Sequence, residues 1–160
     1  MVTGRFRRRL VVLCPLLAAA LLVSCGGDGD GAATGEAERS RPPNACPADG
    51  CRATITSATG AGGEVQLTFD ANFDADLARN HFHVFWDTYT AEQVSDDAEP
   101  RFRVQQGNWV PTDDNPYTTS DEVSVKVRQG STRLCVTAGD RNHNVIDPSI
   151  VDCRDVSDLL

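Results

Sequence analysis

The amino-acid sequence predicts an all-β sandwich in its C-terminal two-thirds. From Cys51 onward, apolar residues recur with a period of two in short runs, as they do in half-buried strands. Gly, Asp, Asn and Pro residues, which favour turns, separate these runs. About seven short strands in roughly 110 residues favour an immunoglobulin-like antiparallel β-sandwich, with a jelly roll as the alternative.

The expected strands follow the alternating runs along the chain. They span residues 52–58, 64–70, 81–88, 101–105, 122–128, 133–138 and 145–153. Outside these runs, residues 74–80 and 91–97 have compositions that allow a helical turn.

The expected strand at 81–88 has two different faces, because successive side chains of a strand point in opposite directions. Phe82, Val84 and Trp86 are apolar and predict the core face, where sandwiches of this type often bury a tryptophan. The opposite face carries the residues between and beside them, His81, His83, Phe85 and Asp87. An outward Phe85 has to be covered by a loop or belong to a binding patch, and both interpretations stay open.

The N-terminal segment has the parts of an export signal. A positive region comes first, with Arg5, Arg7, Arg8 and Arg9. Residues 10–23 form an apolar region that is too short to span a bilayer. Leu22-Val23-Ser24-Cys25 resembles the lipobox of bacterial lipoproteins, in which the cysteine thiol receives a diacylglyceryl group before cleavage. The alternative is an ordinary secretory signal with a chance cysteine.

This resemblance implies that residues 1–24 are a signal peptide and that Cys25 anchors the protein at the extracytoplasmic face of the cell membrane. Residues 25–43 are rich in Gly, Ala, Glu, Asp and Ser, so they predict a flexible tether ahead of a domain at 44–160. Without the signal, the chain has 11 basic and 23 acidic residues, a net charge of −12. This charge argues against nucleic acid and anionic lipid surfaces as partners.

Four cysteines remain in the folded domain once Cys14 leaves with the signal and Cys25 is lipidated. In an oxidising compartment they predict two disulfides, and three pairings are possible. The most local pairing joins Cys46 to Cys51 and Cys135 to Cys153. A four-thiolate zinc site is disfavoured, because neither spacing is the C-x2-C of zinc ribbons.

Histidines provide the strongest chemical signal in the exported chain. His81 and His83 project side by side from one strand face and can chelate one metal ion. If the strands follow the immunoglobulin order, this strand is C and 133–138 is its neighbour F, so the loop after F brings His143 to the same edge. The three histidines can therefore share a Zn²⁺ or Cu²⁺ ion, with a nearby carboxylate as a further ligand or as a partner of the ligands, namely Asp74, Asp76 or Asp87. The alternatives are solvated polar residues on an exposed face, and a catalytic histidine.

Two resemblances extend these expectations. His81, His83 and Asp87 have the spacing of the first metal-binding motif of the cupins, which implies a jelly roll that binds a transition metal. Residues 80–153 resemble a group of small uncharacterised secreted bacterial lipoproteins. The similar segments are Asn80 to Thr88, Gln106 to Trp109 and Leu134 to Asp140. The second resemblance implies a single domain and no known activity.

The long connection at 105–121 places aromatic residues beside polar ones, namely Trp109, Asp113, Asp114 and Tyr117. Sandwich domains commonly hold sugars in this way, because aromatic rings stack on sugar C–H groups while carboxylates accept hydrogen bonds from hydroxyls. The alternative is that Trp109 fills the end of the core beneath this loop.

The expected function is binding rather than catalysis. The exported chain has no G-x-S-x-G, H-E-x-x-H, phosphate-loop or C-x-x-C motif, so the common hydrolase and oxidoreductase sites are not indicated. We expect a lipid-anchored module without a cofactor that binds a glycan or protein of the cell envelope. The alternative is a metal-binding domain or a metalloenzyme that uses His81, His83 and His143.

Overall fold

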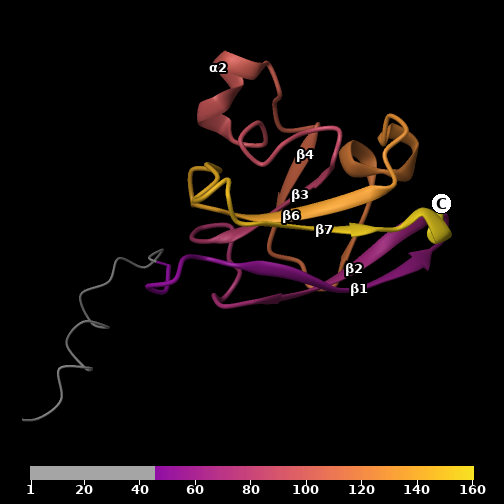
Figure 1. Cartoon of the computed structure of the whole chain (residues 1–160), viewed down its shortest axis with the longest axis horizontal. Helices are drawn as coiled ribbons and strands as arrows, with labels where there is room; N and C mark the ends of the chain where they lie inside the picture. Colours follow the sequence, from indigo (N-terminus) through magenta and orange to yellow (C-terminus); the bar gives the residue numbers. More distant parts are fainter. Residues whose placement is uncertain (1–45) are drawn as a thin grey trace, which may run out of the picture.

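The computed structural model describes residues 46–160 as a sandwich of two antiparallel sheets (Figure 1). One sheet has the order β1-β2-β5, with β1 (Ala53–Ala61), β2 (Glu64–Ala71) and β5 (Tyr117–Thr118). The other has the order β4-β3-β6-β7, with β4 (Trp109–Thr112), β3 (His81–Trp86), β6 (Arg133–Gly139) and β7 (Val151–Asp155). The predicted all-β sandwich is confirmed, and β3 pairs with β6 as strands C and F do in immunoglobulin-like domains.

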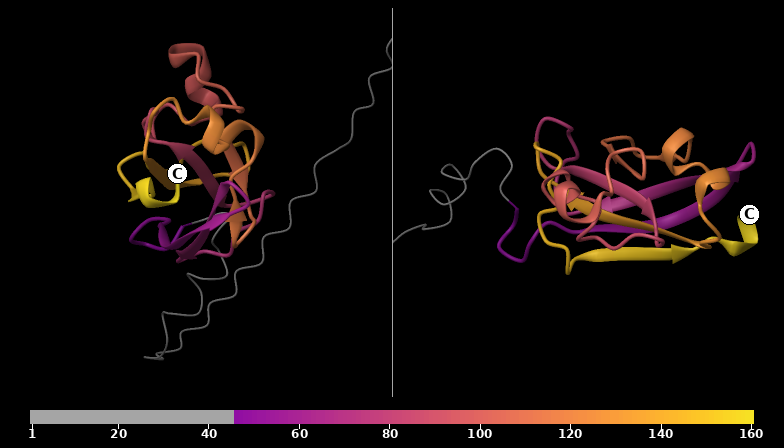
Figure 2. Two further views of the ribbon diagram at one scale, coloured as in Figure 1. Left: turned by 90° about the vertical axis from the view of Figure 1, so that its right-hand side faces the viewer. Right: turned by 90° about the horizontal axis from the view of Figure 1, so that it is seen from above.

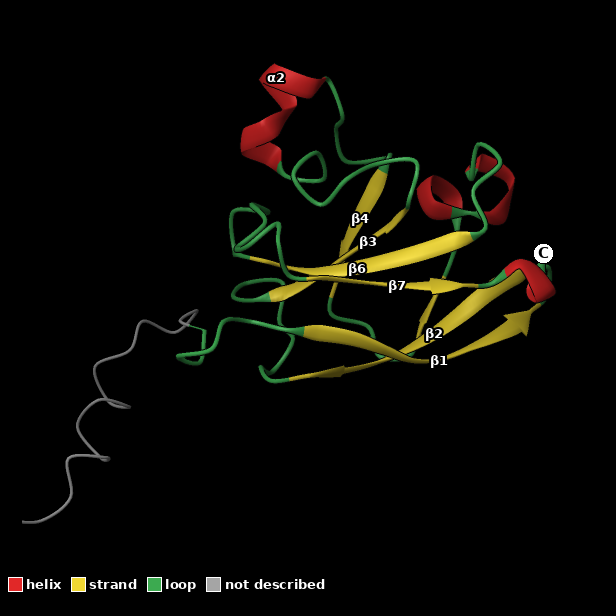
Figure 3. Ribbon diagram, in the orientation of Figure 1, coloured by secondary structure: helices red, strands yellow, loops and turns green. Residues whose placement is uncertain are grey.

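Short helical segments lie between some of the strands and after the last one (Figure 3). They are α2 (Glu99–Phe102) and the 3₁₀ turns Asp96–Ala98, Asp121–Val123, Val125–Val127 and Ser157–Leu159. Among residues 46–160, no helix has the length and apolarity needed to cross a bilayer. The predicted signal peptide at 1–24, the lipidation of Cys25 and the whole tether at 25–43 lie outside the described residues, and they stay predictions.

The main core lies between the two sheets and buries the even positions of β3. Phe82, Val84 and Trp86 are buried there against β1 and β2, as the alternation predicts. The phenylalanine ring of Phe82 lies 4.7 Å from that of Phe69 on β2, centroid to centroid. The indole Nε1 of Trp86 donates a hydrogen bond to the carbonyl of Val123 at 3.0 Å, so its one polar group is satisfied.

Two disulfides join the cysteine pairs that the sequence predicts. Cys46 is bonded to Cys51 across a turn that the hydrogen bond from Gly50 N–H to the Pro47 carbonyl closes at 2.9 Å. Cys135 on β6 is bonded to Cys153 on β7, and the two residues are direct partners in the strand register. The second disulfide therefore fastens the edge strand β7 to the centre of its sheet.

Two predicted strands are absent from the described structure. Residues 101–105 belong instead to the end of α2 and the loop after it, because Pro100 in the first turn favours a helix and Arg103 ends it in a left-handed conformation with φ 59°. Residues 122–128 alternate perfectly but form two 3₁₀ turns, in which Ser124 Oγ accepts the N–H of Lys126.

The sandwich reaches seven strands through elements that the sequence analysis missed. Both β4 and β5 lie within the connection that was predicted as a loop at 105–121. They are short edge strands, and β4 contains Pro111, which only an edge strand tolerates. The expected strand at 145–153 begins only at Val151, because residues before it form turns.

A second hydrophobic cluster covers the outer face of β3. It contains Phe85 on β3, Trp109 on β4 and Cys135 on β6, together with Ala91, Val94 and Val104 from the segment between β3 and β4. Figure 2 shows this segment, which carries α2, rising above the strands as a further layer. The interpretation of this face as solvated is therefore wrong, since His81 and His83 are 0% exposed and Phe85 is 1% exposed.

Candidate metal centre

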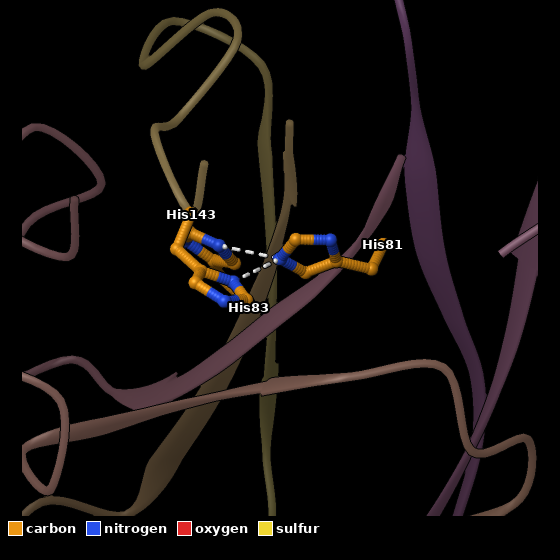
Figure 4. A group of neighbouring side chains, drawn as sticks. All are labelled: His81, His83 and His143. Atoms are coloured by element: carbon orange, nitrogen blue, oxygen red, sulfur yellow. Dashed lines mark hydrogen bonds between the residues drawn. The ribbon is translucent and has the colours of Figure 1, made fainter. Parts of the chain in front are cut away.

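Three histidines converge at the edge of the sheet where β3 begins (Figure 4). The Nε2 atom of His81 lies 3.2 Å from Nε2 of His83 and 3.0 Å from Nδ1 of His143. The three ligand nitrogens all lie within 4.8 Å of one another. The structure thus brings together the three residues that the strand order predicted to meet, two from β3 and one from the turn after β6.

The imidazole of His83 is held in one tautomer. Its Nδ1 atom lies 2.8 Å from the carbonyl oxygen of Val94. A carbonyl oxygen accepts hydrogen bonds but cannot donate one, so Nδ1 carries the proton. The lone pair is then on Nε2, which faces His81. Metal-binding histidines are commonly oriented by such a hydrogen bond from the ring nitrogen that does not bind the metal.

The position of the His83 ring depends on two neighbouring residues. The indole of Trp109 stacks on it with a centroid distance of 4.3 Å and an interplanar angle of 29°. On the neighbouring strand, a Cβ atom added to Gly139 would lie 2.1 Å from His83 Nε2. Only a glycine at 139 therefore leaves room for the imidazole, and the sequence gives no sign of this requirement.

The turn after β6 places His143 through the carboxylate of Asp140. Its Oδ1 atom accepts the N–H groups of Asn142 at 2.8 Å and Asn144 at 3.0 Å. The Asp140 carbonyl accepts the His143 N–H at 2.8 Å, and His143 itself has φ 58° in the left-handed region. Asp140 therefore acts on the geometry of the turn, which fits the preference of Asp for turns that it closes with its own side chain.

Residues 94–97 form hydrogen bonds with both elements that carry the histidines, β3 and the turn after β6. While the Val94 carbonyl holds His83, the N–H of Asp96 donates to the His143 carbonyl at 3.0 Å. Next to it, the N–H of Asp97 donates to Asn144 Oδ1 at 3.1 Å. Most of these contacts use backbone groups, so sequence reasoning could not identify this segment as part of the site.

Burial keeps the two β3 imidazoles neutral. It lowers the pKa of His83 to about 3, and together with the nearby His143 it lowers the pKa of His81 to about 4. At neutral pH both rings are therefore uncharged, which is the form that binds a metal ion. Neutral imidazoles are good ligands for Zn²⁺, Cu²⁺ and Ni²⁺.

Asp87 does not belong to this cluster. It follows the last residue of β3, at the opposite end of the strand from His81. There it accepts a hydrogen bond from Ser131 Oγ and pairs with Arg133 at 3.5 Å. The prediction of Asp87 as a metal ligand is wrong for this geometric reason, and the cupin-like spacing loses its acidic residue.

The residues predicted to bind a glycan do not form an exposed aromatic surface. Trp109 is 0% exposed and Tyr117 is 6% exposed, and they belong to different hydrophobic clusters. Asp113 and Asp114 are exposed beyond the end of β4. Phe85 packs beneath the segment between β3 and β4, so it is covered by a loop and offers no free patch.

Comparison with known proteins adds no functional assignment to this geometry. No protein-family model, no curated protein and no solved structure matches the chain.

Proposed function

We propose that this protein is a lipid-anchored extracytoplasmic domain that binds one transition-metal ion, Zn²⁺ or Cu²⁺. The ligands are His81 Nε2, His83 Nε2 and His143 Nδ1. The observation that carries this proposal is the convergence of three ligand nitrogens, one of which is fixed with its lone pair toward the others.

The hydrogen bonding of the cluster supports a bound cation. His83 uses its proton on the Val94 carbonyl, so it can only accept at Nε2. The Nε2 atom of His81 carries at most one proton, so it can donate a hydrogen bond to only one of its two neighbours, His83 or His143. A metal ion instead accepts a lone pair from each of the three rings. Burying polar rings costs free energy unless they are partnered, and the ion supplies that partner.

The rest of the chain fits a role in binding metal outside the cytoplasm. The net charge of −12 after export raises the local concentration of cations near the surface. Both disulfides in the domain are suited to an oxidising compartment. Since the aromatic residues expected to bind a glycan are buried, the metal site is the better supported function.

Metal titration of the purified protein with both disulfides formed tests the proposal. Calorimetry and elemental analysis should give one equivalent of Zn²⁺ or Cu²⁺ per chain. His83→Ala should lower the metal affinity at least about 100-fold, because loss of a ligand costs more than loss of a residue that only orients one. Asp87→Asn is the matched control, because Asp87 lies at the far end of β3 and its variant should bind as the natural protein does. Absence of saturable binding for both ions would refute the proposal.

The proposed location has a separate test at the cysteine of the lipobox. Cys25→Ala should leave the protein unprocessed or release it from the membrane fraction, because the thiol that receives the lipid is gone. Fractionation with metabolic lipid labelling measures both effects. Continued lipid labelling of the variant would contradict the anchor without affecting the metal proposal.

A further inference from the structure

The separations among the three ligand nitrogens differ in a way that bears on coordination geometry. His81 Nε2 lies 3.2 Å and 3.0 Å from the other two nitrogens. No such contact joins His83 to His143, whose rings are 6.5 Å apart between centroids, compared with 5.1 Å and 4.8 Å for the pairs that include His81. The cluster therefore has two short edges and one long edge, with His81 in the middle (Figure 4).

Tetrahedral and square-planar metal ions require different separations among three nitrogen ligands. With metal–nitrogen bonds of about 2.0 to 2.1 Å, a tetrahedral ion places all three nitrogens about 3.3 Å apart. A square-planar ion places neighbouring nitrogens about 2.9 Å apart and opposite ones about 4.1 Å apart. The two contacts of His81, at 3.2 Å and 3.0 Å, have no counterpart between His83 and His143, and this matches the square-planar pattern of two short edges and one longer edge.

The rings are not equally free to adjust toward a tetrahedron. His83 is held by the Val94 carbonyl and by the Trp109 indole. His81 is fully buried, whereas His143 is half-buried on a turn. Closing the long edge thus depends mainly on His143.

Ligand chemistry points to the same ion. Tetragonal nitrogen sites favour Cu²⁺, with Ni²⁺ the next alternative, and Cu²⁺ is the tightest binding of the divalent series. The cysteines at 46, 51, 135 and 153 are in disulfides, and the single methionine of the chain is Met1. Among the described residues there is therefore no soft sulfur ligand of the kind that would favour Cu⁺.

We infer that the site is a tetragonal Cu²⁺ centre, with His83 and His143 opposite each other and His81 between them. The fourth corner of the plane, opposite His81, is left for water or for an external small ligand. This inference rests on the proposed function and specifies its ion and geometry.

Spectroscopy of the metal-loaded protein tests this geometry. Electron paramagnetic resonance of the Cu²⁺ form should give an axial spectrum with a large parallel copper splitting and nitrogen superhyperfine structure. Azide should change this spectrum by occupying the open corner, and His143→Ala should remove nitrogen couplings. Asp87→Asn should leave the spectrum unchanged, and far-ultraviolet circular dichroism should show that each variant is folded.

Substitution with Co²⁺ tests whether the site is tetrahedral instead. Weak visible bands from the Co²⁺ form would agree with the inference, whereas the intense bands of tetrahedral Co²⁺, with a small parallel copper splitting, would overturn it. In that case ions still bind and the proposed function stands. If neither Cu²⁺, Zn²⁺ nor Co²⁺ binds saturably, the proposed function fails, and the inference fails with it.

Discussion

The two faces of β3 are equally buried but are built in different ways. Phe82, Val84 and Trp86 face the main core between the sheets, where strands from both sheets cover them. His81 and His83 face outward, where the segment between β3 and β4 and the turn after β6 cover them. The inner face is covered by regular strands and the outer face by loops.

Within the six residues of β3, the inner face therefore contributes mainly to stability, whereas the outer face carries the candidate site. Apolar side chains on the inner face gain free energy from burial alone. Imidazoles on the outer face are desolvated, and His83 requires a loop carbonyl that accepts its N–H and a glycine that makes room for its ring. Features that cost stability and yet are supported by several specific contacts are expected at functional sites.

Truncating the inner face should have the largest effect on stability. Phe82→Ala removes a ring that packs on Phe69 and Phe73, so we expect the free energy of unfolding to fall by about 3 to 5 kcal/mol. On the outer face, His83→Ala should cost only about 1 to 3 kcal/mol, mainly through the unpaired Val94 carbonyl. Denaturant unfolding of the metal-free variants measures both. A larger loss for His83→Ala than for Phe82→Ala would contradict the comparison.

The disulfide between β6 and β7 adds stability to the outer face without any metal. Replacing Cys135 and Cys153 together by serine should lower the free energy of unfolding by about 2 to 4 kcal/mol, because the bond closes a loop of about 20 residues. Replacing Cys46 and Cys51 together should cost less, since their loop is shorter. Equal losses for the two pairs would show that loop length does not determine their contributions.

The inner face was predictable from the sequence, because a period of two specifies which residues of β3 enter the core. Residues 122–128 show the limit of that rule. Their alternation is as regular, yet Val123 is buried whereas Val127 is 46% exposed. The segment donates the Val125 N–H to the Glu64 carboxylate and accepts a hydrogen bond from Trp86, so long-range contacts override the local pattern.

The site was predictable only as far as strand order could place histidines. The pairing of β3 with β6 follows from the immunoglobulin-like order, and it brings His143 toward His81. Neither the cover over His83 nor the carbonyl of Val94 has a sequence signal, because backbone groups are the same at every position. The exposure of the histidines was mispredicted for the same reason.

A methyl group at position 139 should weaken metal binding through a local clash with His83. In Gly139→Ala the new Cβ would overlap the His83 ring, so we expect metal affinity to fall about 10- to 100-fold, the range seen when a group that orients a ligand is changed. Gly60→Ala on β1 is the matched control, because a Cβ there meets nothing within 4 Å. Titration with Cu²⁺ measures both affinities. Unchanged binding in Gly139→Ala would show that the imidazole does not need this position.

The response of the metal-free protein to acid also distinguishes the two faces of β3. Burial lowers the pKa of His83 to about 3 and, with His143 nearby, that of His81 to about 4, although Asp140 and Asp113 oppose the shift of His81. In the unfolded chain both side chains return to about 6.5. Between these values the unfolded state binds protons that the folded state does not, so stability falls as the pH falls.

The expected decrease is at most about 1.4 kcal/mol per pH unit for each of the two histidines, starting near pH 6.5 and ending as the pH reaches the folded values. Denaturant unfolding between pH 7 and pH 5, where most carboxylates stay ionised, isolates this contribution. Phe82→Ala should keep the slope, because the inner face of β3 carries no titrating side chain, whereas His83→Gln should reduce it. A flat profile for the natural protein across this range would mean that the outer face does not hold its imidazoles neutral.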